Sequence, residues 1–122
     1  MHKPHRDLRV WQQAMDLVIE IYDATRQFPS EEKFGLTSQM RRCGVSIPSN
    51  IAEGAAKSSQ SDYARFLTIA IGSVAELDTQ LELARRLRFL SEENHKSLDQ
   101  NLESISRMLV ALRHSVRKAN DS

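Results

Sequence analysis

Cysteine, proline and glycine are scarce in this chain of 122 residues, which has one Cys, three Pro and four Gly. A single thiol, Cys43, excludes an intrachain disulfide, and this suits a reducing compartment. Because Cys43 lies on an apolar helical stripe, we expect it to be buried as a small hydrophobic side chain. So few turn-forming residues favour long helices over many turns, and the composition predicts an all-α protein.

Long hydrophobic runs and a large charge of one sign are also missing. The longest uninterrupted apolar run, Met108 to Leu112, is far short of the roughly 20 residues that a membrane span needs. The basic N-terminal segment leads into no apolar stretch, so we predict no signal peptide and a cytoplasmic protein without membrane contact. The net charge is only +1, so any affinity for nucleic acid must come from an uneven distribution of charge.

The length corresponds to a single domain, residues 1–122, with one hydrophobic core. Apolar residues recur at helical spacing in four segments, about 8–27, 36–56, 61–89 and 92–118. Short connections between long helices favour antiparallel neighbours, so we predict an up-down-up-down four-helix bundle. Ser61 and Ser91 are the predicted N-caps of the last two helices.

Pro48 lies inside the second predicted helix. A proline there frees the carbonyl four residues earlier, where Gly44 offers the least crowding. This favours a kinked but continuous helix. The alternative is a break, in which Asn50 caps a new helix and Glu53 completes a capping box.

The third and fourth predicted helices differ in their apolar surface. The fourth keeps a heptad-like seam at Leu98, Leu102, Ile105, Leu109, Leu112 and Val116. The third carries an apolar arc of roughly 200°, about twice what a surface helix needs. Its flanking residues are Ile69, Leu83 and Leu87 on one side and Leu67 and Ile71 on the other. This excess predicts a further partner, and an oligomer would supply it.

Motifs for catalysis are missing. The chain has no nucleophile elbow, phosphate loop or dinucleotide fingerprint. We therefore predict no enzyme, no catalytic residue and no cofactor. We also predict no metal site, with His2, His5, His95 and His114 exposed to solvent.

Glu53 and Glu76 flank apolar stripes, so they are candidates for an acid–base pair. The competing interpretation, which we favour, is structural pairing with Arg42 or Arg65. Gly54 and Gly72 are interpreted as places where two helices approach closely.

Basic residues gather in two places. Arg85, Arg86 and Arg88 end the third predicted helix, and the fourth carries Arg107, Arg113, His114, Arg117 and Lys118 with no acid between Glu103 and Asp121. The helix dipole accounts for part of this pattern. The arginines and Lys118 are our candidate phosphate contacts, because Arg107, His114 and Lys118 fall opposite the leucine seam.

Several short motifs point to a family. They are Asp7-Leu8-Arg9-Val10-Trp11-Gln12, Phe28-Pro29, Gly35-Leu36, Gln39-Met40-Arg41-Arg42, Ser46-Ile47-Pro48-Ser49-Asn50-Ile51-Ala52-Glu53-Gly54, Arg65-Phe66-Leu67 and Gly72-Ser73-Val74-Ala75-Glu76-Leu77. With them the chain resembles the four-helix bundle proteins first known from intervening sequences in bacterial 23S ribosomal RNA genes.

The resemblance implies an antiparallel four-helix subunit assembled as a ring-like pentamer, with no established enzymatic activity. It implies structural or interfacial roles for Arg42, Asn50, Glu53, Arg65 and Glu76. A related branch, the accessory proteins of diversity-generating retroelements, forms basic barrels that bind nucleic acid and a reverse transcriptase. This chain departs from that branch in its near-neutral charge.

The leading hypothesis is a non-enzymatic homo-oligomer that binds structured RNA or a ribonucleoprotein through repeated basic patches. The alternative is a ring that recruits another protein and binds no nucleic acid. A third hypothesis, an enzyme that uses Glu53 and Glu76, requires both carboxylates to line one accessible cleft.

Overall fold

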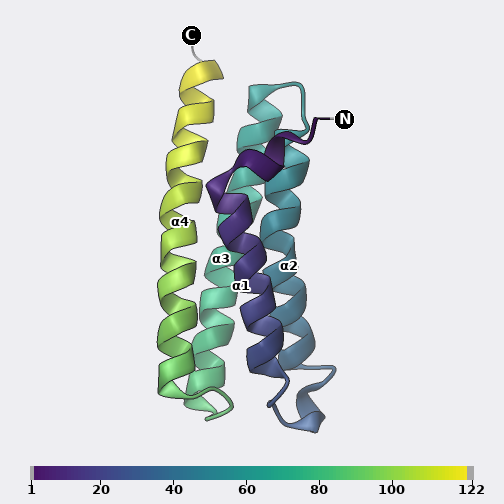
Figure 1. The fold of residues 1–122 in the computed structure, drawn as a ribbon, viewed down its shortest axis with the longest axis vertical. Coiled ribbons are helices and arrows are strands. Elements are labelled where there is room, and N and C mark those ends of the chain that lie inside the picture. Colours follow the sequence, from purple (N-terminus) through teal and green to yellow (C-terminus); the bar gives the residue numbers. More distant parts are fainter. Residues whose placement is uncertain (1, 121–122) are drawn as a thin grey trace.

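The computed structural model describes residues 2–120 and contains four long helices. They are α1 (Arg9–Thr25), α2 (Leu36–Ala55), α3 (Gln60–Arg86) and α4 (Glu92–Asn120), with short 3-10 turns η1 (Pro4–Asp7) and η2 (Ser30–Glu32) before α1 and α2 (Figure 1). No strand occurs in this part of the chain. The prediction of an all-α chain with four helices is confirmed.

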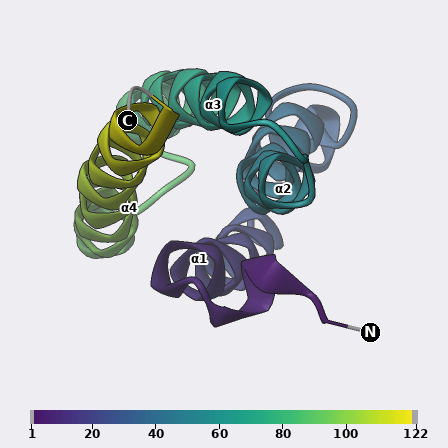
Figure 2. The same cartoon turned by 90° about the horizontal axis from the view of Figure 1, so that it is seen from above.

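The connections lie at two ends of the molecule. The α1–α2 and α3–α4 connections are at the lower end in Figure 1, and the α2–α3 connection is at the upper end with the N and C labels. Seen from above, the helices follow one another around the core in chain order (Figure 2). Each helix contacts its neighbours in the chain, and α1 also contacts α4.

The predicted leucine seam of α4 faces the core. Leu98, Leu102, Ile105, Leu109 and Val116 are buried, and Leu112 packs against the core half-buried. The three other helices supply most of the remaining core, and their largest fully buried side chains are Leu17, Ile21, Met40, Ile47, Ile51, Leu67, Leu77 and Leu81. The periodic positions of the sequence therefore form one contiguous core.

Helix α2 runs without a break through Pro48. Asn50 caps no new helix, because its side-chain amide donates to the carbonyl of Ser46 at 2.7 Å. Gly44 is buried, and a Cβ there would lie 2.9 Å from Cδ1 of Ile21. The continuous helix is confirmed, the break is wrong, and Gly44 also serves close packing against α1.

The ends of α3 differ from the prediction. Ser59, not Ser61, is the N-cap, and its hydroxyl accepts a hydrogen bond from the Asp62 amide at 3.0 Å. At the other end, α3 stops at Arg86 because Arg88 adopts a left-handed conformation with φ 64°. The amides of Arg88 and Phe89 then donate back into the last turn, to the carbonyls of Arg85 and Ala84. Ser91 caps α4 as predicted, accepting from the amide of Asn94 at 3.1 Å.

The two glycines interpreted as close approaches behave differently. A Cβ at Gly54 would lie 2.9 Å from Cβ of Phe66, so α2 and α3 do meet closely there. At Gly72 no atom of another helix lies within 4 Å of that position, and the residue is exposed. Within this chain, the prediction is confirmed for Gly54 and wrong for Gly72.

Cys43 is buried as predicted. Its thiol donates to the Ser73 carbonyl at 3.1 Å and to Oε2 of Glu76 at 3.2 Å. Burial, and then the hydrogen bond to the Glu76 carboxylate, raise the pKa of Cys43 to about 12. The residue therefore stays a protonated thiol that links α2 to α3.

None of the helices formed by residues 2–120 combines the length and the apolar character needed to cross a lipid bilayer.

Candidate nucleic-acid interface

The cations at the end of α3 are already engaged with carboxylates. Arg85 binds Glu82 at 2.7 Å and Glu92 at 3.2 Å, and Arg86 binds Glu82 at 2.8 Å. Hydrogen bonds from Arg85 and then Arg86 lower the pKa of Glu82 to about 2. Because each guanidinium is bound to a carboxylate, these two candidates have less free charge to offer a phosphate.

Arg88, the third candidate of this cluster, is exposed and forms no ion pair with any described residue. Arg88 has a left-handed backbone and lies in the α3–α4 connection, beyond the end of α3. The predicted cluster is therefore divided into two paired arginines and one free arginine.

The candidates on α4 are mostly free of carboxylates. Arg107 is 4.0 Å from Glu103, with both side chains largely exposed. Arg113 donates to the Thr68 hydroxyl of α3 at 3.2 Å. Arg117 and Lys118 are exposed and have no ion pair within the described chain. An exposed pair such as Arg107–Glu103 has little strength, so the distal half of α4 is a basic surface.

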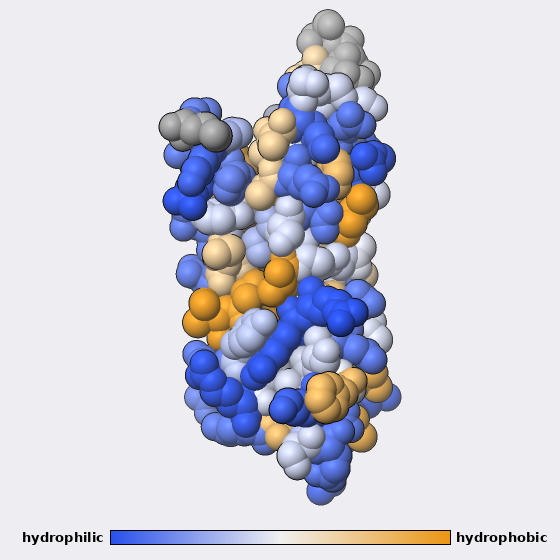
Figure 3. Space-filling model, turned by 90° about the vertical axis from the view of Figure 1, so that its right-hand side faces the viewer, coloured by the Kyte–Doolittle hydropathy of each residue, from blue (hydrophilic) through white to orange (hydrophobic). Residues whose placement is uncertain are grey.

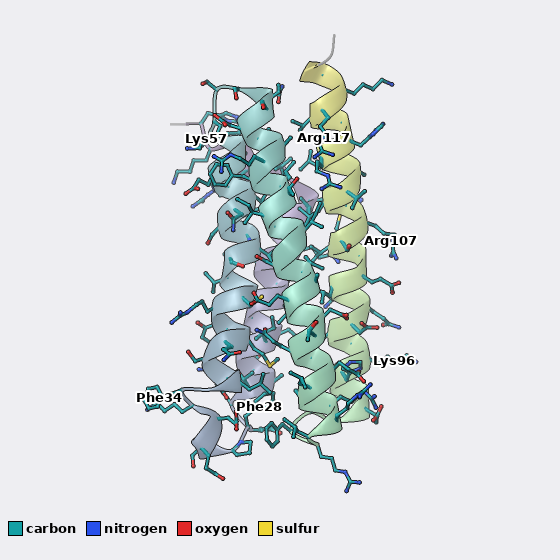
Figure 4. All side chains as sticks on the ribbon, turned by 180° about the vertical axis from the view of Figure 1, so that it is seen from behind. Phe28, Phe34, Lys57, Lys96, Arg107 and Arg117 are labelled. Carbon is teal, nitrogen blue, oxygen red and sulfur yellow. The ribbon has the colours of Figure 1, made fainter. Side chains whose placement is uncertain are left out.

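Two further cations lie at the same end of the molecule, one on α3 and one in the α2–α3 connection. The Lys57 ammonium and the Arg65 guanidinium lie 5.2 Å and 4.6 Å from the centre of the Phe66 ring. Arg65 is one helical turn before Thr68, the residue that Arg113 contacts. Its ion pair with Asp62 is long, 3.9 Å, and solvent-exposed. The group formed by Lys57, Arg65, Arg113, Arg117 and Lys118 is hereafter the upper basic group, and Figure 4 labels Lys57 and Arg117 at this end.

A second set of unpaired cations was not singled out from the sequence. Lys33, Arg41 and Arg42 lie near the α1–α2 connection together with Tyr22 and Phe34, and they line one surface hollow. Only Arg42 among them was a candidate, and only as an interface residue. The missed signal is local: no acid stands three or four residues from Arg41 or Arg42 on α2.

Glu53 and Glu76 do not form an acid–base pair. Glu76 contacts Cys43, which is ten residues before Glu53 on α2, or about 15 Å along the helix axis. Both carboxylates are exposed, and neither is paired with an arginine among residues 2–120. The preferred pairing with Arg42 or Arg65 is therefore wrong, and the catalytic interpretation has no common cleft to support it.

The four histidines lie in different environments. His2 and His114 are exposed, whereas His5 packs edge-on against Trp11 and His95 is half-buried, 3.7 Å from Glu82. Glu92 and His95 form a Glu-x-x-His pair that reasoning from the sequence overlooked. No group of three or more possible metal ligands occurs in the described chain.

Comparisons with known proteins agree with this architecture. One solved structure is a protein of unknown function from the S23 ribosomal protein family of Bacteroides thetaiotaomicron VPI-5482. It is 24% identical to this chain, with a TM-score of 0.79, and the match covers 86% of this chain and 95% of the other. At that identity the likeness shows the fold alone. A search of the curated proteins gave no match.

The family model described as "23S rRNA-intervening sequence protein" matches residues 6–111. The matched range contains α1, α2, α3 and all of α4 except its last turns. This range contains every motif on which the resemblance was based. The chain therefore belongs to the 23S rRNA-intervening sequence protein family.

Proposed function

We propose that this protein is a non-enzymatic, cytoplasmic, homo-oligomeric four-helix bundle that binds structured RNA, alone or within a ribonucleoprotein. In this proposal an antiparallel up-down-up-down subunit assembles into a ring-like homopentamer. The observation that carries the RNA-binding role is the upper basic group: five cations of α3, α4 and the α2–α3 connection lie at one end of the bundle, and the one ion pair among them is long and exposed.

The geometry of this group suits phosphates better than bases. Arg113 and Arg117 lie one turn apart on α4, about 6 Å along the axis, which is close to the spacing of successive phosphates along a nucleic-acid strand. The Phe66 ring is not available for stacking, because it is buried under Lys57 and Arg65. Such contacts give affinity that depends strongly on salt and little on sequence.

The outer face of α3 supports an oligomer. Ile69, Leu83 and Leu87 are 41%, 48% and 54% exposed, so the broad apolar arc is only partly covered within the subunit. Gly72 lies among them without a neighbour, at a cost of about 1 kcal/mol relative to alanine in an exposed helix. A second helix packed against this face would cover the apolar side chains. It could approach closely at Gly72, because glycine has no Cβ. A ring would also repeat the basic group once per subunit.

The test is fluorescence anisotropy of a labelled RNA hairpin, titrated with protein over a salt series. The variant Arg113→Glu with Arg117→Glu should abolish binding without changing the subunit number measured by sedimentation. The matched control, Arg86→Glu with Lys96→Glu, makes the same change in charge on α3 and α4 outside the upper basic group. Equal loss in both variants would show a nonspecific effect of charge, and unchanged affinity in the first would remove α4 from the proposal.

A protein-binding scaffold is the second candidate, and one observation favours it. An apolar groove of about 340 Å³ lies between α1 and α2 beside η1, lined by residues that include Trp11, Met15, Val18 and Val45. Figure 3 views the molecule from the α2 side and shows hydrophobic residues gathered about halfway along this face. A nuclease-resistant, stoichiometric protein partner in the purified material, with no hairpin binding, would favour the scaffold.

A further inference from the structure

The hollow near the α1–α2 connection is lined by aromatic rings and basic side chains. It has a volume of about 460 Å³, and its lining includes Tyr22, Lys33, Phe34, Arg41 and Arg42, which we call the aromatic-basic hollow. The lining residues come from three places: the last turn of α1, the segment after η2 and the first three turns of α2. Figure 4 labels Phe34 at the lower end of the molecule, opposite the upper basic group.

The Arg41 side chain is fixed by contacts within the protein. Its Nε donates to the Thr25 hydroxyl at 2.9 Å and its Nη2 donates to the Tyr22 carbonyl at 3.4 Å. The guanidinium carbon lies 4.5 Å from the centre of the Tyr22 ring. No carboxylate takes part in these contacts. The result is a fixed, planar, cationic surface, the kind of surface on which a nucleobase stacks.

Phe34 is the most exposed large apolar side chain in the described chain, at 90%. It packs into no core, and its one ring contact is with its neighbour Lys33, whose ammonium lies 5.5 Å from the ring centre. A phenylalanine that contributes so little to folding is free to present its ring to a ligand.

Of the carboxylates nearest in sequence, Glu32 and Asp23 are engaged elsewhere, and Glu31 lies exposed in η2. Glu32 accepts a hydrogen bond from the Leu36 amide at 3.0 Å, at the start of α2. Asp23 is paired with Arg26. Lys33, Arg41 and Arg42 form no ion pair within residues 2–120. The hollow therefore favours an anionic ligand.

We propose that the aromatic-basic hollow binds unpaired nucleotides, with bases stacked on Phe34 and on the fixed Arg41 and adjacent phosphates bound by Lys33 and Arg42. This proposal rests on the proposed RNA-binding function, and it adds a second site for a different part of the RNA. Stacking requires bases released from a duplex, because paired bases do not expose their faces. The upper basic group would then contact the helical part of a structured RNA and the hollow an unpaired part.

The test compares three labelled probes of equal length by anisotropy: an unpaired ten-nucleotide adenosine RNA, an abasic strand with the same phosphates, and an RNA hairpin with a short loop. The variant is Phe34→Ala, and the matched control is Ile19→Ala, which truncates another large apolar side chain that is 62% exposed. We expect Phe34→Ala to weaken binding of the adenosine strand about ten-fold and to leave the hairpin unchanged. Ile19→Ala should change neither.

Each result decides a different claim. If the hairpin binds but the adenosine strand binds no better than the abasic strand, the stacking site is overturned and the proposed function stands. If no probe binds, the RNA-binding function fails, and the hollow fails with it. If Phe34→Ala changes the subunit number in sedimentation, the hollow is an interface between copies of this chain and the proposal is overturned.

Discussion

The two connections at the lower end of the bundle carry similar basic residues but present different surfaces. They touch each other through Phe28 and Phe89, whose ring centres are 5.6 Å apart. On the α3–α4 side, Arg85 and Arg86 are bound to Glu82 and Glu92. On the α1–α2 side, the three cations of the hollow have no such partner in the described chain.

The difference comes from helical spacing. Glu82 precedes Arg85 and Arg86 by three and four residues, so one carboxylate reaches both guanidinium groups. Arg41 and Arg42 have only polar or apolar residues at those positions. A count of basic residues therefore misleads, and the spacing of acids from bases is the better guide to charge available for a ligand.

The largest expected effect follows from removing the contact between the two connections. Phe28 is buried, so Phe28→Ala should lower the free energy of unfolding by about 3 kcal/mol through lost burial and a cavity. Urea unfolding measures this change. The matched control, Phe34→Ala, should alter stability by no more than about 0.5 kcal/mol, because that ring packs against no core. Similar losses in both variants would show that Phe34 is also a structural residue.

The α3–α4 connection contains a strained residue, Arg88, and the described α1–α2 connection contains none. The left-handed backbone of Arg88 costs a residue with a Cβ roughly 1–2 kcal/mol, and glycine avoids that cost. Arg88→Gly should therefore stabilise the protein by about 1 kcal/mol, or raise Tm by roughly 4 °C. The control Arg107→Gly, at an exposed position inside α4, should lower stability by about 1 kcal/mol. A loss of stability in Arg88→Gly would contradict the described helix end.

Acid should weaken the ion pairs of the α3–α4 connection in a predictable range. The pKa of Glu82 is lowered from 4.5 to about 2, so the stabilisation from its hydrogen bonds is complete above pH 4.5 and is lost as the pH falls toward 2. The difference in Tm between the unmodified protein and Glu82→Gln should therefore be constant above about pH 5 and shrink below it. A difference that does not vary from pH 2 to pH 6 would show that Arg85 and Arg86 do not hold the carboxylate in solution.

The smallest expected effect is a change in the salt dependence of RNA binding, and it tests the difference between free and paired arginines directly. Arg42→Gln and Arg86→Gln remove the same charge from one free and one paired arginine. If the unpaired strand binds at the hollow, Arg42→Gln should reduce the slope of log affinity against log salt by about 0.7, and Arg86→Gln should leave it unchanged. Equal slopes in the two variants would show that pairing does not control which cations contact RNA.

Periodicity alone predicted the helices well, because apolar spacing reports directly on which face is buried. The leucine seam of α4, the continuous α2 and the cap at Ser91 are all found in the structure. The end of α3 was missed since the left-handed position is occupied by Arg88 and not by glycine. The distance between Glu53 and Glu76 depends on how α2 packs against α3, which periodicity does not report. The aromatic-basic hollow could not be predicted because its residues come from α1, α2 and the segment between them.

The hydrogen bonds from Ser97 and Asn101 to Glu20, at 2.7 Å and 2.6 Å, join α4 to α1 across 77 and 81 residues of chain. Every other contact between two of the four long helices joins helices that follow one another in the sequence. Closing such a long loop costs more entropy than forming a hairpin of adjacent helices. We therefore expect α1–α2, α2–α3 and α3–α4 to assemble early and the α1–α4 contact to form last. Amide hydrogens along α1 should accordingly exchange with solvent sooner than those of α3, because both helices that α3 contacts are also its neighbours in the chain.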